Sequence, residues 1–162
     1  MKAIKVITLF LTAVLIFCSC GKSEIKDISM YDLCKSMSAG AGFEDMTYIS
    51  NSDDNAADNF TYISDLEYDK VNAWFDYYAS DGAVCADEIA VIEVKDSNDT
   101  VTAENSLRDH LEYRTSLYKT YAPEQVPKLN KAAVFSYENF AVLIISDNPS
   151  DVKAAFMNAV NN

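Results

Sequence analysis

The first apolar pattern of the chain after its N-terminal segment has the spacing of a helix. Ser29, followed three residues later by an acidic side chain, is typical of a helix start, and two glycines beyond residue 39 are typical of a helix end. The pattern predicts a helix over residues 29–39. Its apolar face holds four residues at the spacing i, i+3, i+4 and i+7, namely Met30, Leu33, Cys34 and Met37.

Two segments near the middle of the chain have the pattern of β-strands. Apolar and polar positions alternate over residues 71–80, with aromatic residues on both faces, and residues 88–94 are rich in β-branched side chains. Asp81-Gly82 between them is a turn signal, so the two strands are expected to pair as a hairpin. The acidic region before them is weakly periodic. It predicts a short strand over 46–49 and a surface loop over 51–59.

The longest predicted helix begins among Asn98, Asp99 and Thr100 and ends before Pro123, because proline has no N–H and breaks a helix. Its apolar face is assigned to Leu107, Leu111, Tyr118 and Tyr121, widened by His110, Leu117 and Arg114.

A second hairpin and a final helix follow. The hairpin joins residues 132–137 to 140–145, and Asn139 suits its tip because asparagine tolerates a positive φ. Asn148 is expected to cap the last helix with Pro149 at its first position. The apolar stripe of this helix is Val152, Ala155, Phe156, Ala159 and Val160.

The order of elements is an N-terminal helix, a variable region, and then β-β-α-β-β-α. Two hairpins with helices on one face predict an α+β fold of two layers with an antiparallel sheet. The length after the signal is that of one domain. We therefore divide the chain into a signal peptide over 1–19, a tether over 20–28 and a single domain over 29–162.

The N-terminus has the pattern of an export signal. Lys2 and Lys5 precede an apolar run over residues 6–17, which is long enough for a secretory signal but too short to span a membrane. Ser19-Cys20 after this run resembles the lipobox of bacterial lipoproteins, although Phe17 stands where leucine is usual. The resemblance implies a lipid on Cys20, which would anchor the domain at the outer face of the cytoplasmic membrane. The alternative is a plain secretory signal.

Charge narrows the range of partners. The chain carries 13 basic and 25 acidic residues, and removal of Lys2 and Lys5 with the signal leaves a net charge of −14. Such a surface is repelled by phosphate backbones and anionic lipid headgroups, which argues against nucleic-acid binding and against membrane contact other than through Cys20. The simplest interpretation is that the charge keeps an exported domain soluble.

Beyond Cys20, the exported chain has two cysteines, Cys34 and Cys85. An exported domain permits a disulfide between them. Two free thiols fit the sequence equally well, because unpaired cysteine packs as a small apolar residue.

The second half of the chain resembles a known family. The residues that carry the resemblance are the strand Glu88-Ile89-Ala90-Val91, the motif Tyr121-Ala122-Pro123-Glu124-Gln125 and the final hairpin through Phe140–Ser146. They resemble small lipoproteins of Gram-positive anaerobic bacteria, classed as a domain of unknown function, over about residues 70–160. The resemblance implies a cell-surface lipoprotein and supplies no activity, cofactor or site.

Few residues indicate catalysis. His110 is the single histidine, which rules out two-histidine zinc motifs, and we expect it to be a packing or surface residue. No Gly-x-Ser-x-Gly elbow is present. The acidic loop Asp53, Asp54, Asn55 and Asp58 lacks the glycine and glutamate of a calcium-binding EF-hand. Neither a metal nor another cofactor is therefore expected.

The aromatic residues Trp74, Tyr77 and Tyr78 could form a binding surface, although aromatics at strand spacing are more often core residues. Taken together, the sequence predicts a non-enzymatic binding or interaction module on a lipid anchor. The alternatives, in order, are a structural or assembly factor of the cell envelope and an envelope hydrolase that uses carboxylates or His110.

Overall fold

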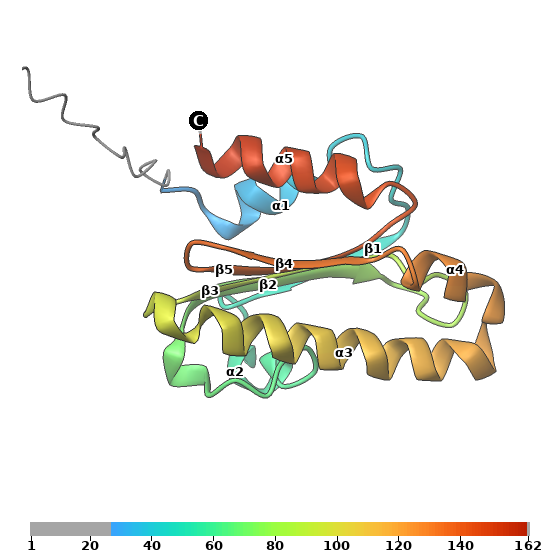
Figure 1. Cartoon of the computed structure of the whole chain (residues 1–162), viewed down its shortest axis with the longest axis horizontal. Coiled ribbons are helices and arrows are strands. Elements are labelled where there is room, and N and C mark those ends of the chain that lie inside the picture. Colours follow the sequence, from blue (N-terminus) through green and yellow to red (C-terminus); the bar gives the residue numbers. More distant parts are fainter. Residues whose placement is uncertain (1–26, 162) are drawn as a thin grey trace, which may run out of the picture.

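Five antiparallel strands form one sheet, in the order β1-β2-β3-β5-β4, in the computed structural model, which describes residues 27–161 (Figure 1). The predicted signal peptide and Cys20 lie outside the described residues. The strands are β1 (Met46–Ser50), β2 (Val71–Ala79), β3 (Glu88–Val94), β4 (Ala133–Tyr137) and β5 (Phe140–Ile145). The helices are α1 (Met30–Ser38), α2 (Ala56–Phe60), α3 (Thr100–Tyr121), α4 (Val126–Leu129) and α5 (Pro149–Asn161).

The two predicted hairpins are confirmed. β2 pairs with β3 and β4 pairs with β5, and β3 and β5 join the hairpins side by side as the central antiparallel pair. β1 adds to the outer edge of β2. The α+β class and the antiparallel sheet are therefore as predicted.

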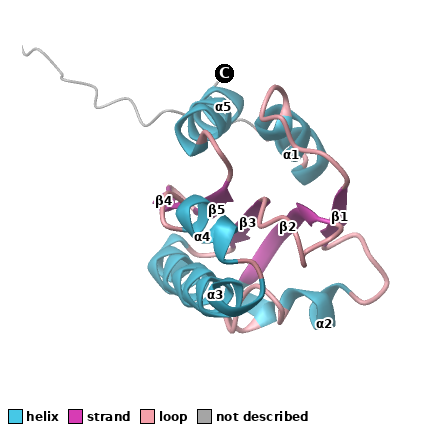
Figure 2. Ribbon diagram, turned by 90° about the vertical axis from the view of Figure 1, so that its right-hand side faces the viewer, coloured by secondary structure: helices cyan, strands magenta, loops and turns pink. Residues whose placement is uncertain are grey.

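Helices cover both faces of the sheet, which corrects the prediction of two layers with helices on one face. α1 and α5 lie on one face, whereas α2 and α3 lie on the other (Figures 1 and 2). Alternate residues of β3 enter two separate cores: Ile89 and Val91 pack towards α1 and α5, and Ala90 and Ile92 towards α3. A strand buried on both faces reads as a continuous apolar run, and the runs in β3 and β5 have this character.

Two local predictions were wrong. Residues 51–59 are not all loop, because α2 forms over the end of this segment and buries Phe60 against the Trp74 ring, 5.5 Å between centroids. At the tip of the β4–β5 hairpin, Glu138 rather than Asn139 has the positive φ, 52°. Asn139 instead holds the hairpin to β3, where its Nδ2 donates to Glu93 Oε1 at 2.9 Å.

The face of α3 also differs from the prediction. Its buried residues are Thr100, Ala103, Ser106, Leu107 and Tyr118, whereas Tyr121 and Leu117 are exposed. The N-terminal half of α3 packs on the sheet through Leu107 and several small side chains, and its last turns extend past the strands towards α4 (Figure 1). α1 and α5, by contrast, bury residues from the predicted stripes.

Because helices cover both faces of the sheet, residues on either face of β3 should contribute to stability. Ile89 and Ile92 are both fully buried, on opposite faces of β3. Truncation of either to alanine should lower the free energy of unfolding by about 2–5 kcal/mol, because each change removes packed methylene groups and leaves a cavity. Urea denaturation of the two variants tests this. A loss under about 0.5 kcal/mol for either variant would mean that its face is open to solvent.

Candidate functional site

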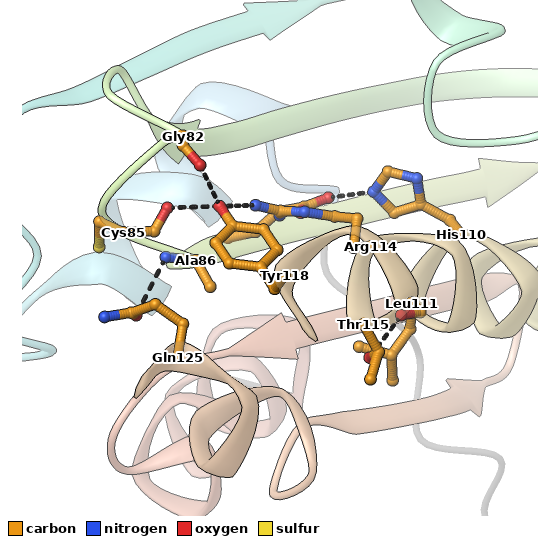
Figure 3. Close-up of polar contacts among 10 residues, drawn as sticks. Gly82, Cys85, Ala86, His110, Leu111, Arg114, Thr115, Tyr118 and Gln125 are labelled. Carbon is orange, nitrogen blue, oxygen red and sulfur yellow. Dashed lines mark hydrogen bonds and ion pairs between the residues drawn. The ribbon is translucent and has the colours of Figure 1, made fainter. Parts of the chain in front are cut away.

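Three polar side chains of α3 point towards the sheet on one face of the helix. His110, Arg114 and Tyr118 are spaced four residues apart, so they lie in a row (Figure 3). Each contacts a group on β3 or in the segment 80–87 between β2 and β3. This row forms one wall of the candidate site.

Glu88 is the acidic partner of this row. It is the first residue of β3, lies opposite Tyr78 of β2 and Ile145 of β5, and is 1% exposed. Its Oε1 lies 2.8 Å from His110 Nε2, and its Oε2 forms an ion pair with Arg114 Nη1. A carboxylate this deeply buried needs paired charge and hydrogen bonds, and α3 supplies both.

Arg114 continues the network to the 80–87 segment. Its Nη2 donates to Tyr118 Oη at 3.0 Å, and its guanidinium lies 5.3 Å from the Tyr118 ring centroid. Tyr118 Oη is 2.7 Å from the backbone carbonyl oxygens of both Gly82 and Cys85, and its single proton is donated to one of them at a time. Arg114 is therefore already engaged by Glu88 and Tyr118.

Asp76 faces the same cavity as this network. It sits in β2 between Ile49 of β1 and Ala90 of β3 and is 6% exposed. Its Oδ1 is buried and accepts no hydrogen bond within the described part of the chain. Burial raises the pKa of Asp76 from its ordinary 3.8 to about 7, even though the charge of Arg114 acts in the opposite direction.

His110 is held as a neutral imidazole at pH 7. Burial lowers its pKa to about 4, and a hydrogen bond with the Tyr62 backbone opposes this shift. A neutral imidazole has one N–H, so it can donate either to Glu88 or to the Tyr62 carbonyl but not to both. His110 therefore adds a hydrogen-bonding group to the site without adding a positive charge.

These side chains surround a cavity of about 310 Å³, which we call the α3 cleft. Its apolar wall comes from Ile49, Ile63 and Ala79, and a second hollow of about 360 Å³ shares Tyr62, Ile63 and His110 with it. A concave, partly apolar cavity with a few convergent polar groups is the usual form of a small-molecule site. The α3 cleft is lined by Ile49, Tyr62, Ile63, Asp76, Tyr78, Ala79, Ser80, Gly82, Glu88, His110 and Arg114.

The aromatic surface suggested by the sequence does not form. Trp74 is fully buried, and its indole Nε1 donates to Tyr68 Oη at 3.3 Å. Tyr77 packs on the opposite face of β2, with its ring 6.1 Å from that of Phe43. Only Tyr78 of the three lines the α3 cleft. Because neighbouring strand residues point to opposite faces, Tyr77 and Tyr78 cannot share one surface.

Cys34 and Cys85 are both free in the structure. Cys34 lies on the buried face of α1, where burial raises the pKa of its thiol to about 12. Cys85 lies in the 80–87 segment, with its Sγ 3.3 Å from Asp87 Oδ2. The structure thus has the arrangement of two separate thiols, one of the two alternatives left open by the sequence.

Among the described residues, neither the acidic loop nor the other carboxylates form a group that could hold a metal ion. Asp53 Oδ2 accepts from the Ser50 backbone N–H at 2.6 Å and so belongs to the turn after β1. Over residues 27–161, no three histidine, cysteine, aspartate or glutamate side chains are grouped as metal ligands. Within the same range, no helix combines the length and hydrophobicity of a membrane span.

Sequence reasoning missed Asp76, Glu88 and Arg114 as a group. The usable signals were acidic residues inside two predicted strands and the four-residue spacing from His110 to Arg114. The apolar context of Asp76 and Glu88 argued for burial, and burial requires a partner. Which cation pairs with which carboxylate depends on the tertiary position of α3.

The chain matches the family described as a domain of unknown function, DUF4358, over residues 45–146. This segment is more than half of the chain, which therefore belongs to that family, as the resemblance predicted. The match begins before the expected residue 70, just ahead of β1, and so includes the acidic segment that precedes β2. It ends before α5. No curated protein and no solved structure matches the chain.

The buried network predicts that two arginines on α3 differ in how much stability the domain loses when each is replaced. Arg114→Met leaves Glu88 without its cationic partner and should lower the free energy of unfolding by about 3–5 kcal/mol. Arg108→Met is the matched control, because Arg108 pairs with Glu104 at the surface of the same helix. It should cost no more than about 1 kcal/mol. Equal losses in urea denaturation would contradict the assignment of Glu88 and Arg114 as a buried pair.

Proposed function

We propose that this protein is an extracytoplasmic lipoprotein, anchored through Cys20, whose domain binds a small molecule in the α3 cleft. The anchor rests on the lipobox resemblance and on the lipoproteins that the second half resembles. The binding role rests on one observation above all. Asp76 is buried in the wall of a cavity with an oxygen that no described residue satisfies.

An unsatisfied buried carboxylate lowers the stability of the domain, since the charged form is deprived of water without compensation. A buried polar group without a partner calls for an explanation, and a bound ligand or ion is one; perturbed pKa values also cluster at functional sites. The cavity is large enough for a small molecule and includes both apolar wall and hydrogen-bonding groups.

Binding is favoured over catalysis because the potential catalytic groups are engaged with one another. Glu88 is committed to Arg114 and His110, and His110 Nε2 faces that carboxylate rather than a serine or cysteine nucleophile. A neutral histidine with a pKa of about 4 is a weak base at pH 7. These features suit a site that fixes a ligand by preorganised polar contacts.

A second candidate is an assembly role at the cell envelope. Tyr113, Leu117 and Tyr121 are exposed and follow one another at four-residue spacing on α3. An exposed apolar stripe of this kind is a feature of interaction surfaces. The binding role ranks first because the α3 cleft combines a cavity with a group that lacks its partner.

The anchor is tested by processing. The protein isolated from its host should begin at Cys20 and carry a diacylglyceryl group in mass spectrometry. Cys20→Ser should release the domain from the membrane fraction, since two acyl chains are what hold it there. Cys18→Ser is the matched control and should leave it bound. A different N-terminus, or membrane retention of the Cys20→Ser protein, would contradict a lipid anchor.

The cleft is tested by blocking it. Ser80 is exposed and lines the α3 cleft, so Ser80→Trp should fill its mouth without disturbing the core. Native mass spectrometry after incubation with a small-molecule extract of the host should show a bound compound on the wild-type protein. The same compound should bind the control Ser116→Trp, which changes an exposed serine away from the cleft. Binding to all three proteins, or to none, would contradict the proposal.

A further inference from the structure

The two acidic side chains that line the α3 cleft differ in whether a positive charge is paired with them. Among its lining residues, Glu88 carries one negative charge that Arg114 balances, and His110 is neutral at pH 7. The charge of Asp76 is then not balanced by a neighbouring cation of the cleft. Its side chain is 6% exposed, and no donor of the described chain bonds to its Oδ1. The cleft therefore presents one net negative charge when Asp76 is ionised.

Two nearby polar side chains, Arg114 and Ser80, have partners other than Asp76. The Arg114 Nη1 and Nη2 groups contact Glu88 and Tyr118, and the Ser80 hydroxyl is 2.8 Å from Thr47 Oγ1. No donor of the described chain bonds to Asp76 Oδ1, so a molecule in the cavity can supply the missing hydrogen bond. A charged N–H donor gives a stronger hydrogen bond to a carboxylate than a neutral donor does.

We propose that the α3 cleft recognises a primary ammonium group and that Asp76 is its counter-ion. This inference rests on the proposed function and specifies its ligand class. An anionic ligand would be repelled by Asp76, and the negative net charge of the whole chain acts in the same direction. A quaternary ammonium has no N–H and would leave Asp76 Oδ1 unsatisfied. Tyr62 and Tyr78 line the same cavity, and aromatic rings attract cations.

The ionisation of Asp76 gives the inference a second consequence. The titratable and charged groups near it are Tyr62 before β2, Tyr78 on β2, Glu88 on β3, His110 and Arg114 on α3, and the Cys34 thiol of α1 across the sheet. Since burial raises the pKa of Asp76 to about 7, the carboxyl is protonated below that pH and ionised above it. Affinity for an ammonium ion should therefore rise with pH through about 7 and then level off.

Isothermal titration calorimetry of the full-length protein in mild detergent tests the inference with three probes of similar size. These are n-butylammonium, its neutral counterpart n-butanol, and tetramethylammonium, a cation without an N–H donor. n-Butylammonium should bind at least about tenfold more tightly than either of the others. Below pH 7 its affinity should fall by roughly tenfold per pH unit.

Two isosteric variants test whether n-butylammonium binding depends on Asp76. Asp76→Asn should weaken n-butylammonium binding by at least about tenfold and abolish its pH dependence. Asp109→Asn removes the same charge from an exposed residue that lines the adjoining hollow, and it should change the affinity by less than about twofold. The pH profile of the wild-type protein provides an independent readout if Asp76→Asn alters the fold.

Equal binding of n-butanol or tetramethylammonium, or unchanged binding by the Asp76→Asn protein, would overturn the inference. If n-butylammonium does not bind, while a host compound binds the wild-type protein but not the Ser80→Trp protein, the ammonium assignment alone is wrong. If neither n-butylammonium nor a host compound binds the wild-type protein, the proposed binding function is wrong as well.

Discussion

The ion pair between Glu88 and Arg114 is the constraint on which the rest of the site depends. A carboxylate that is 1% exposed at the start of the central strand must be paired, and the partner can come only from the helix that covers that face. The pairing fixes the position of α3 along the sheet, and with it the positions of His110 and Tyr118. Tyr118 in turn ties the β2–β3 connection to the helix through two backbone carbonyls.

Arg114 forms its ion pair with Glu88, and its positive charge only partly offsets the effect of burial on Asp76. Two carboxylates and one guanidinium in a low-dielectric cavity cannot all be neutralised, so one acid must either take up a proton or find a cation. That imbalance distinguishes the α3 cleft from a structural salt bridge. It is the physical basis for the proposal that the cavity binds a ligand.

Local patterns predicted most of the elements but not how they stack. The strands, both hairpins and the helices 30–38 and 149–161 follow from periodicity, caps and turns. The second helical layer was missed, although the unbroken apolar run of β5 indicated burial on both faces. The site was the least accessible to sequence reasoning, because Asp76 and Glu88 acquire their roles only through residues on α3. His110 was expected to be a packing or surface residue, and its place in the cleft depends on the same tertiary contact.

The ionisation of Asp76 is the most direct test of this account, and carbon-13 NMR of its side-chain carboxyl can follow it as a function of pH. The account predicts a midpoint near pH 7 in the ligand-free protein, shifted to lower pH when a cation occupies the cleft. A midpoint near the ordinary aspartate value of 3.8 would show that the protein itself stabilises the ionised carboxylate. It would contradict the claim that Asp76 lacks a cationic partner in the ligand-free cleft.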